Sequence, residues 1–270
     1  MVRVTEFGEV VRFDVARNIL GKGRYWTTCY LVGGTLIDSG CAHAAAELVR
    51  ELGGRKVSLV LHTHRHEDHI GGTGAVRRAH PAVQIAAHPE TVTVLADPRL
   101  QRLHPYRRVM WGWPEPVPAR ALAPGEVVAA PPFRFAVVPT PGHSSDHLCF
   151  FEPERGWLFS GDLYVGGRDR ALSADADVGA IVASLRRVAE LPIARLFPGS
   201  ARVPDDAAAA LAGKIAHYEE LGERVVTLRR QGRSVGAIAR SVCGPPMQIE
   251  LITLGHFSRR GLVRSFLRGA

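Results

Sequence analysis

One short segment of the chain is rich in side chains that bind metal ions. Residues 62–69, HTHRHEDH, hold four histidines, one glutamate and one aspartate. His64, His66 and Asp68 alternate along the chain, so in an extended turn their side chains point to one side. His69 follows at once, where we expect a helix to begin. Imidazoles and carboxylates are ligands of zinc, iron and manganese, so this spacing predicts a metal site.

The surrounding pattern places this segment at the end of a strand. Residues 56–61, KVSLVL, are apolar and partly β-branched, which predicts a buried strand. The histidine-rich segment follows directly, and α/β proteins bind ligands at the carboxyl ends of their strands. Gly71 and Gly72 then permit a tight turn and open the next predicted helix, residues 71–80.

Short strands and helices alternate through the first two hundred residues. Apolar runs predict strands, a Gly33-Gly34 turn predicts a hairpin, and amphipathic spacing predicts helices. The predicted strands are 9–16, the hairpin 29–40, 56–61, 83–88, 133–140, 148–153, 156–162 and 194–199. The predicted helices are 42–52, 71–80, 89–96 and 177–191.

Two segments depart from this alternation. Residues 97–120 are rich in Pro, Arg and Trp with weak periodicity. They are predicted to be a long loop, either a lid over a site or an ordered surface loop. From Pro204 onward the pattern predicts helices only. We therefore expect a catalytic domain at residues 1–203 and a helical, winged-helix-like appendage at residues 204–270.

The composition excludes several classes of protein. The chain has 270 residues, 46% of them hydrophobic and 22% charged, as in ordinary globular proteins. It contains no apolar run long enough to span a bilayer, and its N-terminus lacks the pattern of a secretory signal. The four cysteines include no C-x-x-C pair, which fits a reducing compartment, so a cytoplasmic protein is expected. The net charge of +8 favours a solvated basic surface over a nucleic-acid site.

Four motifs occur in an order typical of one family. Residues 64–69 read H-x-H-x-D-H, which resembles the signature of the metallo-β-lactamase superfamily. The segments IDSG (37–40), TPGHSSDH (140–147) and FSGD (159–162) resemble further motifs of that family. The resemblance runs from about residue 10 to about residue 200. It implies a four-layer αβ/βα sandwich, an α/β fold, with a metal centre at one edge.

The resemblance also implies a set of metal ligands and a chemistry. At the matching positions, His64, His66 and His143 hold one metal ion, and Asp68, His69 and Asp162 hold a second, with Asp162 shared. The expected cofactors are one or two divalent ions, zinc first, with iron and manganese as alternatives. Such an ion lowers the pKa of its bound water to about 7, and the resulting hydroxide attacks an ester, thioester, amide or phosphodiester. Asp68 is the expected catalytic residue that orients the hydroxide.

The chain departs from the family at one position. Where the superfamily often has P-G-H on its last core strand, residues 198–200 read Pro-Gly-Ser. The hydroxyl of Ser200 is a poor ligand for zinc, so the second site is short of one ligand. Three outcomes follow: water or substrate fills the gap, the protein works with one ion, or it binds without turnover. The retained ligands favour a metal-binding hydrolase with an asymmetric site.

Other polar residues near the motifs have structural alternatives. His62 is expected to be structural and to hydrogen-bond a backbone group. His147 either contacts a substrate or supports His143, and structural roles are commoner for a lone histidine. Tyr164 either lines the pocket or packs at a strand end. Nothing in the spacing brings His217 or His256 to the metals.

The leading hypothesis is a metal-dependent hydrolase of a small ester, thioester or lactone, similar to the glyoxalase II-like branch. One alternative is an RNA-cleaving phosphodiesterase, because the C-terminal region resembles the tail of lactamase-like endoribonucleases. Its arginines more simply form a solvated helix face. Another is a mono-iron oxidoreductase similar to persulfide dioxygenases, and a non-catalytic binding protein is a further class. A small-molecule substrate and no membrane are expected, while substrate identity and oligomeric state stay open.

Overall fold

Two β-sheets packed face to face form the centre of the molecule. The computed structural model describes residues 1–101 and 103–268. One sheet has seven strands in the order β1 to β7, and the other has five in the order β13-β11-β10-β9-β8. The first comprises β1 (Val2–Phe7), β2 (Val10–Ile19), β3 (Lys22–Val32), β4 (Thr35–Ile37), β5 (Leu59–Leu61), β6 (Gln84–Ala87) and β7 (Arg120–Ala121). The second comprises β8 (Val127–Ala130), β9 (Phe133–Pro139), β10 (Leu148–Glu152), β11 (Trp157–Gly161) and β13 (Arg195–Pro198).

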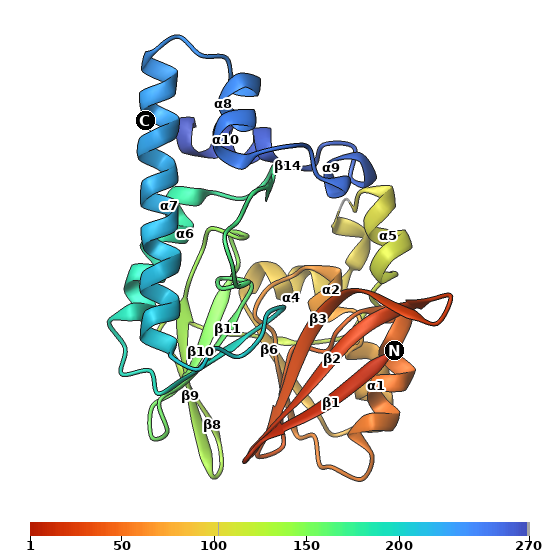
Figure 1. Cartoon of the computed structure of the whole chain (residues 1–270). Coiled ribbons are helices and arrows are strands. Elements are labelled where there is room, and N and C mark those ends of the chain that lie inside the picture. The colour runs from red at the N-terminus through yellow and green to blue at the C-terminus, as the bar shows by residue number, and fades with distance from the viewer. Residues whose placement is uncertain (102, 269–270) are drawn as a thin grey trace.

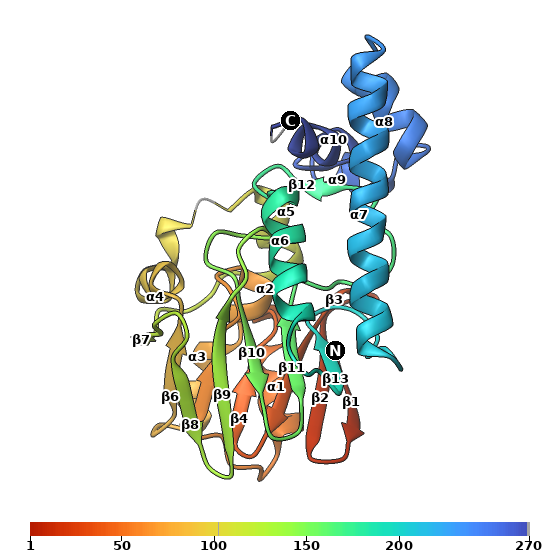
Figure 2. The same cartoon turned by 90° about the vertical axis from the view of Figure 1, so that its left-hand side faces the viewer.

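Helices cover both outer faces of this pair of sheets (Figure 1, Figure 2). The N-terminal half contributes η1 (Ala42–Ala44), α1 (Ala45–Leu52), α2 (Glu67–Ile70), α3 (Thr73–Ala79), α4 (Pro89–Ala96), η2 (Pro98–Leu100) and α5 (Pro105–Trp111). The C-terminal half contributes α6 (Val178–Ala189), α7 (Ala207–Arg230), α8 (Val235–Cys243), α9 (Gln248–Ile252) and α10 (Arg259–Arg268). The four-layer αβ/βα sandwich predicted from the sequence is confirmed.

Three buried clusters hold the layers together. Phe135, Phe150, Phe159 and Phe197 from the second sheet pack with residues of the first in the cluster between the sheets. A second cluster joins the first sheet to the helices on its outer face. Burial of apolar surface at these three interfaces is the main force that fixes the layers.

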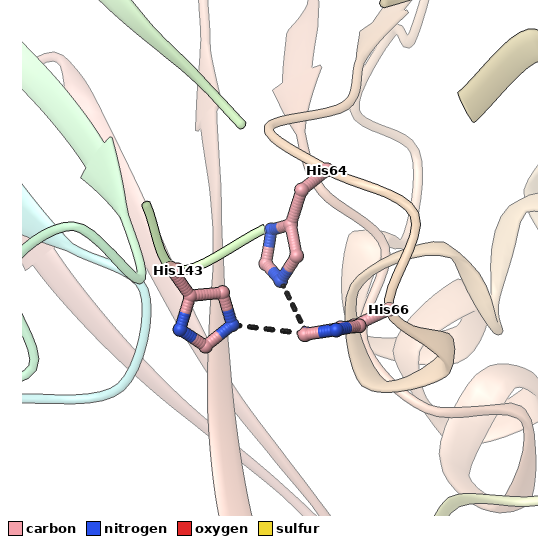
Figure 3. A group of neighbouring side chains, drawn as sticks. All are labelled: His64, His66 and His143. Atoms are coloured by element: carbon pink, nitrogen blue, oxygen red, sulfur yellow. Dashed lines mark hydrogen bonds between the residues drawn. The ribbon is translucent and has the colours of Figure 1, made fainter. Parts of the chain in front are cut away.

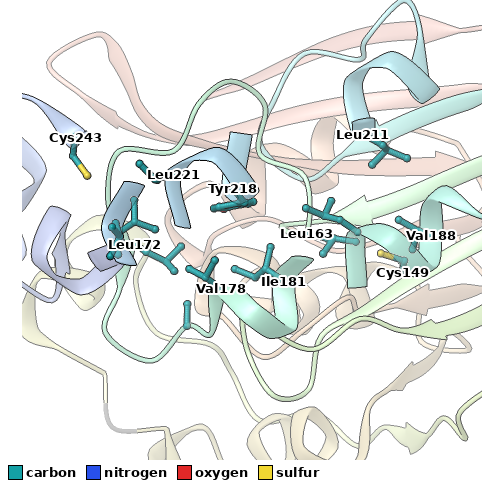
Figure 4. Close-up of a cluster of buried hydrophobic side chains, with 14 of the residues drawn as sticks. Cys149, Leu163, Leu172, Val178, Ile181, Val188, Leu211, Tyr218, Leu221 and Cys243 are labelled. Carbon is teal, nitrogen blue, oxygen red and sulfur yellow. The ribbon is translucent and has the colours of Figure 1, made fainter. Parts of the chain in front are cut away.

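The third cluster joins the C-terminal helices to the sandwich. Leu211, Tyr218 and Leu221 of α7 pack with Val178 and Ile181 of α6 in one buried group (Figure 4). Helix α7 begins where the Asp206 carboxylate accepts the Ala209 N–H at 2.9 Å, as a capping residue does. The division at residue 203 stays a prediction, and residues 269–270 of the predicted appendage lie outside the described residues.

Two predictions about the irregular segments were wrong in part. Residues 97–120 are not only loop, because Pro105–Trp111 form α5. Proline at the first helical turn starts this helix and is tolerated there. The tail is not wholly helical, because β14 (Phe257–Ser258) pairs antiparallel with β12 (Leu172–Ser173). Strands of two residues are too short to leave a periodic signal, so tertiary pairing alone creates them.

The sequence pattern also failed to predict the first strand, β1. Residues Val2–Phe7 pair with β2 in an antiparallel register, at the edge of the first sheet. Most of the strand is exposed, so it lacks the apolar run that marked the buried strands. Among the described residues, no helix is both long enough and apolar enough to span a membrane.

Candidate metal centre

A buried aspartate organises the turn that carries the histidine-rich segment. Asp38, at the end of β4, accepts the Thr63 N–H at 2.9 Å and the Thr63 hydroxyl at 2.8 Å. It also lies 2.8 Å from His69 Nδ1. Asp38 adopts a φ of 60°, a left-handed conformation that aspartate tolerates better than most residues. These bonds fix the segment after β5 to the neighbouring strand and so set the direction of its histidines.

Three imidazoles converge beside this turn. His66 Nδ1 lies 3.0 Å from His64 Nε2 and 2.9 Å from His143 Nε2 (Figure 3). The Nδ1 atom of His64 is bonded to the Thr63 hydroxyl at 2.9 Å, so Nε2 is the atom that faces the group. One ligand atom from each of the three histidines lies within 4.8 Å of the others, a spacing that fits one metal ion.

A second group of donors adjoins the first. One ligand atom each from His64, His69 and Asp162 also lie within 4.8 Å of one another. His69 Nε2 is 3.4 Å from Asp162 Oδ1 and 3.9 Å from Asp68 Oδ2. Among the described residues, His69 Nε2 and Asp68 Oδ1 are buried with no hydrogen-bond partner. Buried polar atoms are rarely left unpaired, and either a cation or a water molecule would satisfy these.

The electrostatics of the histidines suit metal ligation. Burial, together with neighbouring imidazoles, holds the pKa of His64 well below its ordinary value. Burial and the Arg107 guanidinium lower the pKa of His66 in the same way, and burial also lowers that of His143. The three imidazoles are therefore neutral at pH 7 and keep their lone pairs for a cation.

The pKa values of His69 and Asp162 shift as those of an ion pair. Burial disfavours both charged forms, but the carboxylates of Asp162 and Asp38 outweigh it and hold the pKa of His69 well above its usual value. The same contact with His69 holds the pKa of Asp162 well below the usual range of a carboxyl group, despite burial. Without a metal ion, a proton on His69 balances these carboxylates, so a cation bound here would replace that proton.

The six predicted ligands lie together. Five of them belong to the two donor groups, and Asp68 lies beside His69. His66, Asp68, His143 and Asp162 line one cavity next to the centre. The assignment of each ligand to a particular ion, and the catalytic role of Asp68, stay predictions.

Ser200 lies beside the second donor group, where the sequence motif predicts the residue at this position. Its hydroxyl donates to Asp162 Oδ1 at 3.3 Å, on the side of the second donor group. The preceding Gly199 anchors this turn by donating its N–H to the Gly161 carbonyl at 2.8 Å. A Cβ atom on Gly199 would lie 2.9 Å from Asp162 Oδ1, so glycine is required for the close approach.

The remaining predicted histidines have structural contacts. His62 is buried as expected, but its Nε2 lies 2.9 Å from the Thr73 hydroxyl, so the predicted backbone partner was wrong. His147 Nε2 accepts the backbone N–H of Asp162 at 3.1 Å, so it supports Asp162 rather than His143. His217 and His256 belong to neither donor group.

A mainly apolar cavity of about 290 Å³ opens beside the centre. Tyr164 is not part of its wall and packs against the cluster around α6 and α7, whereas its neighbours Leu163 and Val165 line the cavity. The segment from α9 to β14 contributes Ile249, Thr253 and Phe257 to the wall of this cavity. The other apolar or aromatic side chains of the wall are Tyr25, Trp26, Tyr106, Trp111, Ala171, Leu172, Ile181 and Tyr218. A second, more polar cavity of about 650 Å³ also lies next to the centre, and His66 and His143 are among the residues that line it.

Sequence reasoning missed Arg107, the charged residue of α5 at the centre. Its Nε donates to Glu67 Oε1 at 2.6 Å, and its Nη2 lies 3.7 Å from Asp68 Oδ1. Burial opposes the charge of this guanidinium, but the carboxylates of Glu67 and Asp68 outweigh burial and raise its pKa. The only signal in the sequence was the abundance of Arg and Trp in residues 97–120. Through α5, that segment forms a wall of the site.

A comparison with models of protein families shows to which family the chain belongs. The model described as the Metallo-beta-lactamase superfamily matches residues 26–200, more than half of the chain. The chain belongs to the metallo-beta-lactamase superfamily. The resemblance drawn from the four motifs is thus confirmed, and the matched region ends at Ser200.

Curated members of the superfamily that resemble this chain include hydrolases. The lactamase-like protein adaB of Aspergillus niger is 30% identical over 216 residues, 77% of this chain and 60% of that protein. The hydroxyacylglutathione hydrolase of Legionella pneumophila (strain Lens) is 28% identical over 173 residues, 62% of this chain and 57% of that protein. Thioesterase pkgB of Emericella nidulans is 29% identical over 225 residues, 80% of this chain and 55% of that protein. The chain thus spans between 55% and 60% of the length of these relatives.

Solved structures of the superfamily share the fold over most of the chain. A metallo-beta-lactamase family protein from Thermus thermophilus superposes with a TM-score of 0.68 at 21% identity, covering 97% of this chain and 92% of that chain. A beta-lactamase domain protein from Burkholderia ambifaria gives a TM-score of 0.67 at 19% identity, covering 100% of this chain and 85% of that chain. At these identities the likeness establishes the fold alone.

Proposed function

We propose that this member of the metallo-beta-lactamase superfamily is a metal-dependent hydrolase of a thioester or a related ester or lactone. The observation that carries the proposal is the convergence of His64, His66 and His143 beside a mainly apolar cavity. A site that combines metal ligands with an apolar wall can hold an acyl group next to the reacting centre. The names of the hydroxyacylglutathione hydrolase and the thioesterase among its relatives support a thioester.

His64, His66 and His143 are the residues that would hold the ion. When bound, a divalent ion there lowers the pKa of water and polarises a substrate oxygen. The Asp68 carboxylate, which lies beside His69, would accept a hydrogen bond from the attacking water and so orient it. The apolar wall excludes bulk water from the acyl group and positions its carbonyl carbon.

Zinc is the proposed metal, because neutral imidazoles with a nearby carboxylate are its common ligands. Iron and manganese accept the same donors, so elemental analysis of the purified protein decides the identity of the metal. We also propose that the protein works in the cytoplasm. Its four cysteines are free and buried, as in a reducing compartment.

The test is a hydrolysis assay on protein stripped with a chelator and then reloaded. Acyl thioesters are supplied, and the released thiol is measured with a thiol reagent. We expect hydrolysis to disappear on stripping, to return with zinc, and to be lost in His66→Ala. The matched control is His43→Ala, because His43 is exposed and lies outside both donor groups.

Two outcomes would reject this function. Thioester hydrolysis that persists in the stripped protein would show that the centre is not responsible. A metal-loaded protein that cleaves none of the thioesters, esters or lactones would point elsewhere. Oxygen uptake by an iron-loaded protein with a persulfide would then favour the oxidoreductase, and salt-sensitive cleavage of single-stranded RNA would favour the phosphodiesterase.

A further inference from the structure

The donor groups share one histidine, and this limits the number of ions. His64 belongs to both groups, yet its Nδ1 is bonded to Thr63, which leaves Nε2 as its one ligand atom. An ion on His64, His66 and His143 uses that atom. The second side then retains three donors, His69 and Asp162 from its group and Asp68 beside them. Three protein ligands are the usual number of a catalytic zinc site, so this side has no ligand to spare and lacks the fourth that a histidine at position 200 would add.

Ser200 does not make up the shortage. It occupies the position of the family's usual histidine, and its hydroxyl donates a hydrogen bond to Asp162 Oδ1. A hydroxyl that donates to a carboxylate uses its proton on that oxygen and competes with an ion for it. Ser200 therefore gives Asp162 a hydrogen bond where a histidine would give an ion a ligand.

A buried cation already faces the remaining carboxylate. The Nη2 atom of Arg107 lies 3.7 Å from Asp68 Oδ1, and the Arg107 side chain is 7% exposed. The same side chain lines both cavities beside the centre. A divalent ion bound to Asp68 would lie close to this fixed positive charge and would be repelled by it.

Arg107 is held in this position by two other groups. Its Nε donates to Glu67 Oε1 at 2.6 Å, and the Glu67 side chain is fully buried. Its guanidinium carbon lies 5.1 Å from the centre of the Trp111 ring, a cation–π contact. Moving Arg107 away would leave Glu67 as a buried charge without a partner, which is costly. The Arg107 guanidinium is therefore costly to displace, and a metal ion beside Asp68 would have to bind next to it.

We propose that the centre binds a single metal ion on His64, His66 and His143. The guanidinium of Arg107 supplies the positive charge on the Asp68 side, where the family pattern expects a second ion. Arg107 is thus a positioning residue for Asp68, placed there by α5. The proposal rests on the metal centre of the proposed function, but its test counts ions and needs no assay of hydrolysis.

The experiment measures zinc per chain by elemental analysis after equilibration with zinc and removal of the unbound excess. We expect one ion in the unmodified protein and one in Ser200→His, because Arg107 still faces Asp68. We expect two in the double variant Ser200→His/Arg107→Gln, which has the added ligand and lacks the cation. The matched control combines Ser200→His with Arg108→Gln, since Arg108 is the exposed neighbour on α5, and should bind one.

A further variant protects the test against misfolding. Arg107→Gln leaves Glu67 buried and unpaired, so the triple variant Ser200→His/Arg107→Gln/Glu67→Gln removes both charges of the pair. It should also bind two ions, and its unfolding in urea shows whether it is folded.

Several results would overturn the proposal. Two ions in the unmodified protein, or two in Ser200→His with Arg107 intact, would show that Arg107 does not exclude the second ion. One ion in a folded triple variant would show that the charge of Arg107 does not control binding of a second ion. Absence of zinc from every variant would remove the metal-dependent function as well, whereas the other results leave that function standing.

Discussion

His147 supports Asp162 beside the metal centre. The imidazole Nε2 accepts the Asp162 backbone N–H at 3.1 Å, and Nδ1 lies 2.8 Å from the Thr140 hydroxyl. This ring, which is 1% exposed, joins two motifs and spans 15 residues from His147 to Asp162. The contact fixes the backbone of Asp162, whose Oδ2 lies 3.6 Å from His143 Nε2, so His147 acts on the centre through Asp162.

Replacement of His147 by alanine should weaken metal binding. Loss of a residue that orients a ligand commonly lowers metal affinity by about 10- to 100-fold. Titration of zinc into the stripped protein by calorimetry measures the change, and His43→Ala serves as the control. An unchanged affinity would mean that Asp162 is either held by other contacts or absent from the metal's coordination.

The stripped protein should lose stability as the pH falls. Burial, with the nearby His143, lowers the pKa of His147 from 6.5 to about 3. Between these values the unfolded chain binds a proton at this residue that the folded chain does not bind. The free energy of unfolding should therefore fall by about 1.4 kcal/mol for each pH unit below about 6.5 on account of His147 alone.

Urea unfolding of the chelator-treated protein at a series of pH values measures this slope. In His147→Gln the free energy of unfolding should fall less steeply below about pH 6.5, by about 1.4 kcal/mol per pH unit, because glutamine binds no proton there. His43→Gln should keep the slope of the unmodified protein. Equal slopes in both variants would show that His147 is not the group that titrates.

Replacement of Asp38 by alanine should destabilise the protein strongly. Asp38 is buried and accepts from Thr63 and His69, so its removal leaves their donors unpaired. Removing one partner of a buried charged pair typically costs about 3–5 kcal/mol. Urea unfolding of Asp38→Ala against the exposed control Asp205→Ala gives this difference. A loss no larger than that of the control would contradict the role assigned to Asp38.

A buried lysine ties α7 to the segment that follows Asp162. Lys214 Nζ lies 2.7 Å from Asp169 Oδ2 and donates to the Gly166 carbonyl at 2.9 Å. Lys214→Met should cost up to about 3–5 kcal/mol of unfolding free energy, because Asp169 loses its cationic partner but keeps the hydrogen bond from the Tyr218 hydroxyl. The double variant Lys214→Met/Asp169→Asn should recover part of this loss. A double-mutant cycle in urea measures the coupling, and strictly additive losses would show that the two side chains do not interact.

The metal-binding segment shows how far local sequence reasoning reaches. His64, His66, Asp68 and His69 lie within six consecutive residues, so their side chains are brought together by local backbone geometry. The strand before them was recognisable because it is short, apolar and buried. His143 lies 77 residues from His66, and only the family's order of motifs linked the two.

Arg107 shows where such reasoning stops. It lies 40 residues from Glu67, in a segment whose composition predicted a loop, and no periodicity marked it as buried. The contact between Tyr106 and His256 spans 150 residues and joins α5 to the tail. Burial of charged side chains depends on which partners the fold supplies, and the partners of these residues are distant in sequence.

The sequence by itself determined the family, the ligand-rich turn and the substitution at Ser200, because each is carried by residue types at short spacing. Tertiary structure decided that Arg107 faces Asp68, that His147 supports Asp162 and that α9 contributes to the cavity wall. The physical reason is that hydrogen bonds and ion pairs act over a few ångströms in space, whatever the separation along the chain. Only packing of the layers brings such residues within that distance.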